Sequence, residues 1–246
     1  MSPVFGNEFK YSVERMVYML KSSIAGGMII GIAGTAYVSM PNPIIGAMLF
    51  SVGLMTILFR GIPLYTGAIN TVFEKDGFNI IELVYILVGN FIGATVFSWL
   101  VVLLPNYQDF VEPRLLIIAS RTLSYSFVGT LAAAMLCGMF MYLAAMSFRN
   151  RQASGFIRGI IVILSVMGFI LTGSLHSIAN IFYIAASPIA VFGSRSVLSI
   201  LTMILGNTIG SLLIAALAHR PHDATCKVRP INGSIAPQPT IDEFNV

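Results

Sequence analysis

A histidine lies within one of the most apolar stretches of this sequence. The segment "GSLHSIANIFYIAAS", residues 173–187, holds His176 among small and aliphatic residues. An imidazole there can donate or accept a hydrogen bond, and near its reference pKa of about 6.5 it can also exchange a proton. Ionisable groups in such segments are rare and usually face a cavity or a partner. His176 therefore either ties one helix to another or contacts a substrate.

The elements that must position this histidine are apolar enough to cross a membrane. Of the 246 residues, 57% are hydrophobic and 10% are charged, and the mean hydropathy is +0.87. Soluble domains carry roughly 25% charged residues. Most apolar runs have about the 20 residues that a membrane-crossing helix needs; they cover residues 22–40, 44–59, 80–104, 127–148, 159–187 and 197–218. We predict an all-α membrane protein with six transmembrane helices.

Two of these spans are interrupted at matching places in the two halves of the chain. The second span stops at "RGIPLYTGAIN", residues 60–70, and the fifth stops at "TGSLHS", residues 172–177. A charge, glycines and a proline break a helix in the first case, and a glycine with flanking hydroxyls does so in the second. We expect His176 to face Thr66, its counterpart at the other break.

The third and sixth spans repeat one pattern. "VGNFIGATVF", residues 88–97, resembles "LGNTIGSLLI", residues 205–214. Because each half has three spans, the second copy must enter the membrane upside down. The pattern predicts a 3+3 inverted repeat in an aquaporin-like arrangement, with broken second and fifth helices that meet at a site near the bilayer midplane. Asn90 and Asn207, in matching positions, are expected to bond backbone groups at the two breaks.

The positive charges separate by side of the membrane. One side would hold Lys10, Arg15, Lys21, Lys75, Arg149, Arg151, Arg158, Arg220, Lys227 and Arg229, and the other Arg114, Arg121 and Arg195. This asymmetry predicts that both termini are cytoplasmic. We also expect a multi-pass protein of the cell's inner membrane. The predicted parts are a cytoplasmic N-terminal segment (1–15), a channel domain (16–219) and a disordered cytoplasmic tail (220–246).

Several classes of protein are disfavoured by the residue types. The two cysteines, Cys137 in a span and Cys226 in the tail, should not meet, so neither a disulfide nor a metal site is expected. The spans lack carboxylate pairs, metal-ligand spacing and a Ser-His-Asp set, which argues against an enzyme and indicates no cofactor. The basic residues lack the aromatic interleaving of a nucleic-acid site, and none is expected.

Four motifs, taken together, resemble those of one known family. "LYTG" (64–67), "GNFIGA" (89–94), "GSLHSIANIF" (173–182) and "LGNTIG" (205–210) are similar in order and spacing to motifs of the formate/nitrite transporter family of pentameric anion channels. The resemblance implies a homopentamer in the lipid bilayer whose subunits each hold a pore for a small anion. It also implies two apolar constrictions around a central histidine.

The resemblance assigns roles to particular residues. His176 would be the central histidine and Thr66 the threonine that hydrogen-bonds near it. The constrictions would be formed by Phe50, Leu54, Leu64, Tyr65 and Phe169. Lys10 and Arg121 would supply the positive charge of the cytoplasmic and outer vestibules. Asn90, Asn207 and Asn180 would support the broken helices.

Each of these residues also has an ordinary structural interpretation. Phe50, Leu54 and Phe169 could simply pack in the core, and Thr66 could cap the half-helix that follows it. Leu175 and Pro63 stand where the family usually has a glutamate and an acidic or polar residue, so the substrate stays open. We expect a channel or transporter for the anion of a weak acid, formate or nitrite, with proton coupling through His176 as an option. The alternatives are a hydrosulfide channel and a water or neutral-solute channel.

Overall fold

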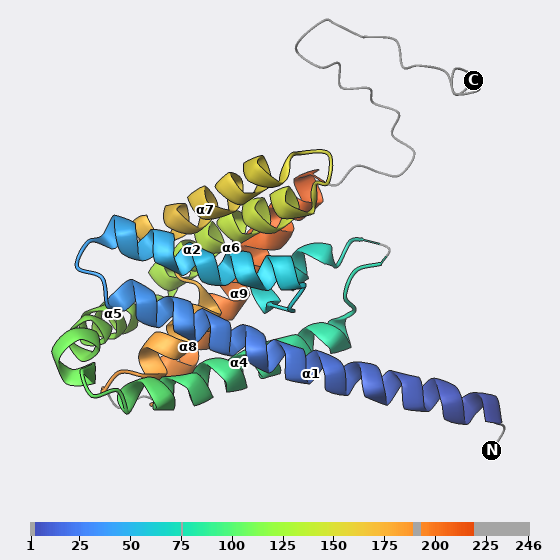
Figure 1. Cartoon of the computed structure of the whole chain (residues 1–246), viewed down its shortest axis with the longest axis horizontal. Helices are drawn as coiled ribbons and strands as arrows, with labels where there is room; N and C mark the ends of the chain where they lie inside the picture. Colours follow the sequence, from blue (N-terminus) through green and yellow to red (C-terminus); the bar gives the residue numbers. More distant parts are fainter. Residues whose placement is uncertain (1–2, 75, 189–192, 219–246) are drawn as a thin grey trace, which may run out of the picture.

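The regular secondary structure of the described residues is all helical. A computed structural model of the protein describes residues 3–74, 76–188 and 193–218, with side chains described from residue 13 onward. The helices in chain order are α1 (Pro3–Val38), α2 (Pro43–Arg60), α3 (Tyr65–Ala68), η1 (Ile69–Thr71), α4 (Ile80–Val102), η2 (Tyr107–Val111), α5 (Glu112–Ser124), α6 (Phe127–Arg149), α7 (Gly155–Leu171), α8 (Ser177–Ala185) and α9 (Ser194–Ala218). Figure 1 shows their arrangement.

Six crossings of a membrane can be assigned to these helices. Five segments are long and apolar enough by themselves: Val13–Val38 of α1 and the whole of α2, α4, α6 and α9. The sixth crossing combines α7, a shorter apolar helix, with α8. Many large hydrophobic side chains of these helices are exposed, as they would be toward lipid. The predicted all-α, six-span membrane fold is confirmed.

Two closely packed helix pairs form equivalent parts of the two halves. α1 lies along α4, and α6 lies along α9. A Cβ added to Gly27 would lie 2.1 Å from the Asn90 carbonyl oxygen, and one added to Gly138 would lie 2.3 Å from that of Asn207. Only glycine permits such a close approach of two helix backbones. The same contact thus recurs in both halves, as the predicted inverted repeat requires.

The two interrupted spans end in the same way. Gly61 follows α2 with φ of +63°, and Gly173 follows α7 with φ of +71°, the left-handed conformation that favours glycine. The N–H group of the next residue then bonds back to the helix: Ile62 to Ile57 at 3.0 Å and Ser174 to Phe169 at 3.0 Å. This Schellman-type ending satisfies the last carbonyls of each helix and turns the chain inward.

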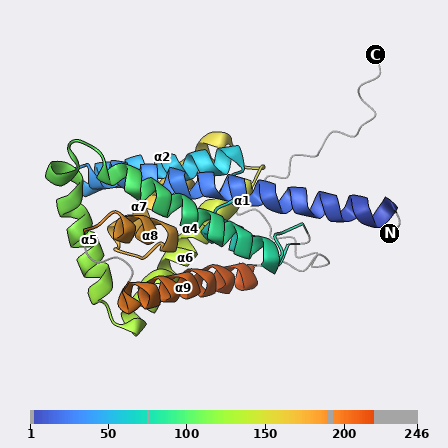
Figure 2. The same ribbon diagram turned by 90° about the horizontal axis from the view of Figure 1, so that it is seen from below.

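One helix was not anticipated from the sequence. α5, with η2 before it, lies across the end of the bundle that is remote from the start of α1 (Figure 2). The Arg114 side chain donates to the carbonyl oxygens of Met40 and Pro41, at the turn between α1 and α2, and the Tyr107 hydroxyl donates to the Ala186 carbonyl. α5 is a short amphipathic helix that covers an end of the bundle, and it is not among the segments long and apolar enough to cross a membrane.

The predicted terminal segments can be compared with the structure only in part. α1 runs unbroken from Pro3 to Val38 and extends past the other helices in Figure 1, so residues 3–15 are continuous with the first span. The predicted tail, 220–246, lies outside the described residues, and so does the side chain of Lys10.

Candidate functional site

The two half-helices meet at a hydrogen bond between Thr66 and His176. Thr66 lies on α3, and His176 immediately precedes α8 as its N-cap residue. Thr66 Oγ1 and His176 Nε2 are 2.9 Å apart. Both side chains are buried, with 0% and 1% of their surface exposed. The expectation from the sequence that these residues face each other across the two breaks is met.

The hydrogen bonds of His176 define which ring nitrogen carries its proton. Nδ1 accepts a bond from the backbone N–H of Ala179 at 3.2 Å, in the manner of an N-cap side chain. In the neutral ring the proton is therefore on Nε2, and Nε2–H donates to Thr66 Oγ1. The hydroxyl proton of Thr66 is left available for another acceptor.

Asn90 holds the first break in place. Its side-chain nitrogen donates to the carbonyl oxygens of Ser23 at 2.7 Å and Pro63 at 3.1 Å, while its Oδ1 accepts from the N–H of Tyr65 at 2.8 Å. One buried amide thus joins α1, the loop after α2 and the start of α3. These loop groups would otherwise be unsatisfied in an apolar surrounding, which is costly.

Asn207 holds the second break through an equivalent set of bonds. Its side-chain nitrogen donates to the carbonyl oxygens of Ala134 at 2.9 Å and Leu175 at 2.8 Å, and its Oδ1 accepts from the N–H of Ser177 at 2.8 Å. These positions match Ser23, Pro63 and Tyr65 in order.

This correspondence corrects one sequence-based expectation. Since Pro63 matches Leu175 and Tyr65 matches Ser177, the residue between them in the first half, Leu64, is the counterpart of His176. Leu64 is the N-cap residue of α3, as His176 is of α8. Thr66 is the hydrogen-bonding partner of the histidine and not its repeat equivalent.

A second buried amide supports the histidine from the other side. The Asn180 side chain donates to the His176 carbonyl oxygen at 2.9 Å. The Thr122 hydroxyl on α5 donates to Asn180 Oδ1 at 3.3 Å. The unanticipated helix α5 thereby helps to position the start of α8.

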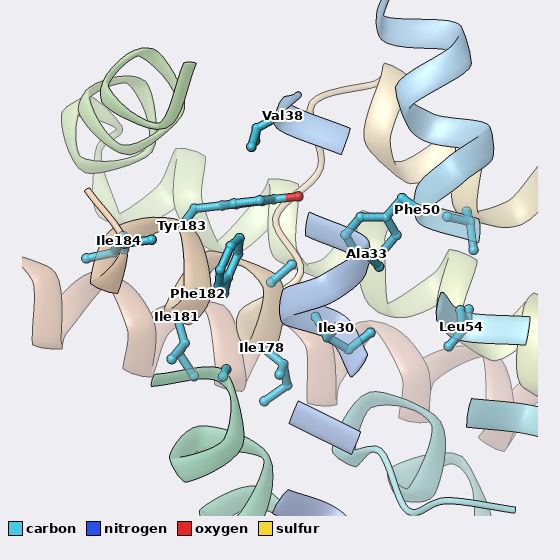
Figure 3. Close-up of a cluster of buried hydrophobic side chains, with 14 of the residues drawn as sticks. Ile30, Ala33, Val38, Phe50, Leu54, Ile178, Ile181, Phe182, Tyr183 and Ile184 are labelled. Carbon is cyan, nitrogen blue, oxygen red and sulfur yellow. The ribbon is translucent and has the colours of Figure 1, made fainter. Parts of the chain in front are cut away.

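Aromatic rings continue the contact from His176 toward α2. The Phe169 ring stacks on the imidazole with ring centroids 5.6 Å apart, and Phe50 meets Phe169 edge-on at 5.8 Å. Phe50 and Leu54 belong to the main buried cluster, together with Leu64 and residues of α8. Figure 3 shows Phe50 and Leu54 among the side chains of this cluster. The polar pair is therefore flanked by apolar side chains from three segments.

An inner cavity reaches the apolar residues from the end of the molecule where α2 and α6 terminate and α7 begins. Its volume is about 460 Å³. Leu54 and Leu64 form part of its wall, and Arg149, Arg151 and Arg158 line it too.

An outer cavity approaches from the opposite end. Its volume is about 100 Å³, and His176, Phe169 and Asn180 line it together with Arg121. Arg121 Nε donates to the Tyr125 hydroxyl at 2.7 Å, which directs the guanidinium group along this cavity. The two cavities share no lining residue: Leu54 and Leu64 line the inner one, Phe169 lines the outer one, and Phe50 lines neither.

Tyr65 has surroundings different from those of the other predicted constriction residues. Its ring packs with Met19, Leu83 and Ile86 in a separate cluster, and its hydroxyl lies 2.8 Å from the hydroxyl of Thr208. It lines neither of the two cavities. Its backbone N–H, bonded to Asn90, is the group that takes part in the site.

Several lining residues were not singled out from the sequence. The outer cavity includes Tyr37, Thr122, Tyr125 and Tyr183, and the inner cavity includes Met141, Phe148 and the three arginines already named. The charges of the α6–α7 connection were used only to orient the chain. No three His, Cys, Asp or Glu side chains of the described residues gather closely enough to hold a metal ion.

The fold and the site together define a multi-pass membrane protein of the channel and transporter class. Two half-helices meet at a buried histidine within a bundle of six crossings; one cavity reaches this histidine, and a second cavity from the opposite end reaches Leu54 and Leu64. The chain belongs to the formate/nitrite transporter family, whose model matches residues 7–220.

Comparisons with single proteins agree with this assignment. An uncharacterized transporter, YrhG of Bacillus subtilis (strain 168), is 28% identical over 195 residues, which cover 72% of this chain and 71% of YrhG. A solved pentameric formate channel with formate bound superposes with a TM-score of 0.70 at 18% identity, covering 83% of this chain and 96% of that channel. An ion channel of the same family gives a TM-score of 0.65 at 17% identity, with coverages of 86% and 90%. At these identities the structural likeness concerns the fold.

Proposed function

We propose that the protein passes small monovalent anions of weak acids, formate or nitrite, through a pore within each subunit. The observation that carries this proposal is the buried Thr66–His176 pair, whose atoms are 2.9 Å apart between two otherwise apolar constrictions. A neutral pair of this kind can give hydrogen bonds to an anion that has lost part of its water. It offers no fixed charge that would hold the anion too strongly for release.

The constrictions would act as a filter for size and hydration. Leu54 and Leu64 face the inner cavity and Phe169 faces the outer one, with Phe50 between them. An anion that passes them must shed water, which costs several kcal/mol at least. Hydrogen bonds from the Thr66 hydroxyl offset part of this cost at the midpoint, since its proton is not used by His176.

Proton coupling would require a change at the start of α8. The neutral ring holds its proton at Nε2. To give a proton to an anion and be left as a neutral ring, His176 must first become imidazolium. Adding that proton at Nδ1 displaces the N–H of Ala179, which is bonded there at 3.2 Å. A proton delivered to a passing anion would restore this cap.

The proposal extends to the assembly and its orientation. The solved relative that binds formate is pentameric, and we propose a homopentamer for this chain in a cell inner membrane with both termini in the cytoplasm. Lys10 on α1 and Arg121 in the outer cavity would raise the anion concentration at the two mouths.

The test is anion flux into liposomes that contain the purified protein. Formate, nitrite, hydrosulfide and chloride are compared at pH values on both sides of about 6.5, the reference pKa of imidazole. We expect flux of formate or nitrite above that of chloride, increasing as the pH falls if protons move with the anion. His176→Asn should change this pH dependence.

The controls separate the alternatives. Empty liposomes give the background flux, and glycerol uptake tests for a neutral-solute pore. Hydrosulfide flux without formate or nitrite flux would identify hydrosulfide as the substrate in place of formate or nitrite. Absence of flux for all four anions from folded protein would reject the anion-channel function.

A further inference from the structure

The inner cavity is much larger than the outer one, and larger than a single small anion needs. The inner cavity has about 460 Å³ and the outer cavity about 100 Å³. Pockets that bind small organic ligands usually have about 300–1,000 Å³. The inner cavity alone falls within this range. It has room for an anion of many atoms, although Leu54 and Leu64 close its inner end.

The wall of the inner cavity carries an excess of positive charge. Of its three arginines, Arg149 is paired with Glu74, with the charged atoms 3.1 Å apart. Neither Arg151 nor Arg158 has a carboxylate partner among the residues that the structure describes. The guanidinium groups of Arg151 and Arg158 are therefore available to bind an anionic ligand.

Arg158 is held in place and still has donors to spare. One terminal nitrogen donates to the Phe148 carbonyl oxygen at 3.0 Å, and the guanidinium lies over the Phe148 ring at 5.5 Å. Its Nε is buried and has no hydrogen-bond partner. The second terminal nitrogen makes no hydrogen bond to the described residues, so the partly exposed guanidinium group can still donate to a carboxylate or phosphate oxygen in the cavity. Arg151 is exposed at the same wall and can close on the other end of such a ligand.

We propose that this arginine-lined cavity binds a polyvalent oxyanion, a di- or tricarboxylate or a phosphate compound, which blocks the pore from the inner side. Planar guanidinium groups match carboxylate and phosphate oxygens in pairs. A ligand of this size and charge cannot pass Leu54 and Leu64, so its binding stops the small anion behind it. The inference rests on the proposed anion flux for its effect, whereas the binding site itself does not depend on it.

Two measurements test the site. Formate or nitrite flux is recorded in liposomes with citrate, pyrophosphate or gluconate on both sides at equal ionic strength. Binding is followed separately by the shift of the unfolding temperature of the detergent-solubilised protein, because a ligand of the folded state stabilises it. We expect citrate or pyrophosphate to slow flux about twofold when its concentration equals its Kd. The monovalent gluconate should have little effect, and the stronger of the two polyanions identifies the carboxylate or phosphate source.

Variants locate the effect at the cavity. Arg151→Ala and Arg158→Lys should weaken both the block and the temperature shift, each compared with the same variant without polyanion. Arg195→Ala, an exposed arginine of α9 outside the inner cavity, should respond like the unchanged protein. Arg158→Lys retains a charge over Phe148, so a folded variant is expected even if Arg158→Ala is unstable.

The possible results bear differently on the two proposals. If flux is present and neither polyanion slows it or shifts the unfolding temperature, the site is rejected and the channel function stands. Block by gluconate as strong as by citrate would also reject it, since size alone would then suffice. If flux is absent but the citrate shift disappears in Arg151→Ala, the site stands and the proposed function fails.

Discussion

Thr66 and His176 share one hydrogen bond, and only one of the two then has a donor left for an anion in the proposed pathway. The ring nitrogen Nδ1 is used by Ala179 and Nε2–H by Thr66, so the neutral imidazole has no free donor. The Thr66 hydroxyl accepts from the ring and can still donate its own proton. At the scale of single residues, the proposed pathway would therefore use the threonine as its direct donor, and the histidine would orient that donor.

Thr66→Val should reduce anion flux while the protein remains folded. Valine has a similar shape but cannot donate to a dehydrated anion, and a hydrogen bond to a charged group contributes about 1.5–3 kcal/mol. We expect about a tenfold or greater loss of formate or nitrite flux in liposomes. The matched control is Thr56→Val, because Thr56 is exposed on α2 and its hydroxyl only bonds the Val52 carbonyl oxygen of the same helix. Equal flux in the two variants would contradict the direct role of Thr66.

At the scale of elements, two asparagines make the short half-helices possible. α3 has four residues and α8 has nine, too few to be stable alone. Each starts at an N–H that is bonded to a buried asparagine on a neighbouring long helix, α4 or α9. The same asparagines bond to α1 and α6, so each long helix pair fixes one half-helix.

Asn207→Leu should destabilise the protein and displace the start of α8. Three hydrogen bonds are lost and their backbone partners stay buried, which costs on the order of 3 kcal/mol or more. We expect a lower unfolding temperature in detergent and reduced flux, since His176 is adjacent to the released Ser177 N–H. Asn106→Ala is the control, because this exposed side chain makes no capping bond at η2. An Asn207→Leu protein as stable as this control would show that the bonds contribute little.

The elements and the site were predictable from the sequence to different degrees. The six spans and the mirrored breaks could be predicted because apolar length, Gly61, Pro63 and Gly173 are local signals. α5 was missed because it is shorter than the spans and mixes charged with aliphatic residues, so a search for long apolar runs does not detect it.

The repeat partner of His176 could not be predicted from local patterns. The equivalent hydrogen bonds from Asn90 to Pro63 and from Asn207 to Leu175 identify this partner as Leu64. The direction of the Tyr65 side chain could not be predicted from the sequence either. Tyr65 immediately precedes Thr66, but its ring packs with Met19 and Leu83 and lines neither cavity.

At the scale of the whole molecule, charge and topology agree on one orientation. Arg15 pairs with Glu82 at 2.7 Å and Arg149 with Glu74 at 3.1 Å, on the same end of the bundle, while Arg114 lies at the opposite end beside the α1–α2 turn. The excess of basic residues on the first end supports the proposal that this end faces the cytoplasm, following the positive-inside rule. The inner cavity, as proposed, then opens to the cytoplasm.

Cysteine labelling in intact cells tests this orientation. Gln108→Cys on η2 and Gln152→Cys after α6 are both exposed and lie at opposite ends. In a Cys226→Ser background, with Cys137 buried, a membrane-impermeant maleimide should label Gln108→Cys at once. Gln152→Cys should react only after the cells are permeabilised. The reverse pattern would place the inner cavity outside the cell.

Leu64 stands where the repeat would place a second histidine, and this difference makes the proposed pathway asymmetric. A scaffold with two identical halves would present the same sequence of barriers to an anion from either end. Here an anion from one end meets a wide basic cavity and a leucine first, and from the other a narrow cavity and an imidazole. Equal and opposite gradients need not then produce equal fluxes, so the pore can rectify without any moving gate.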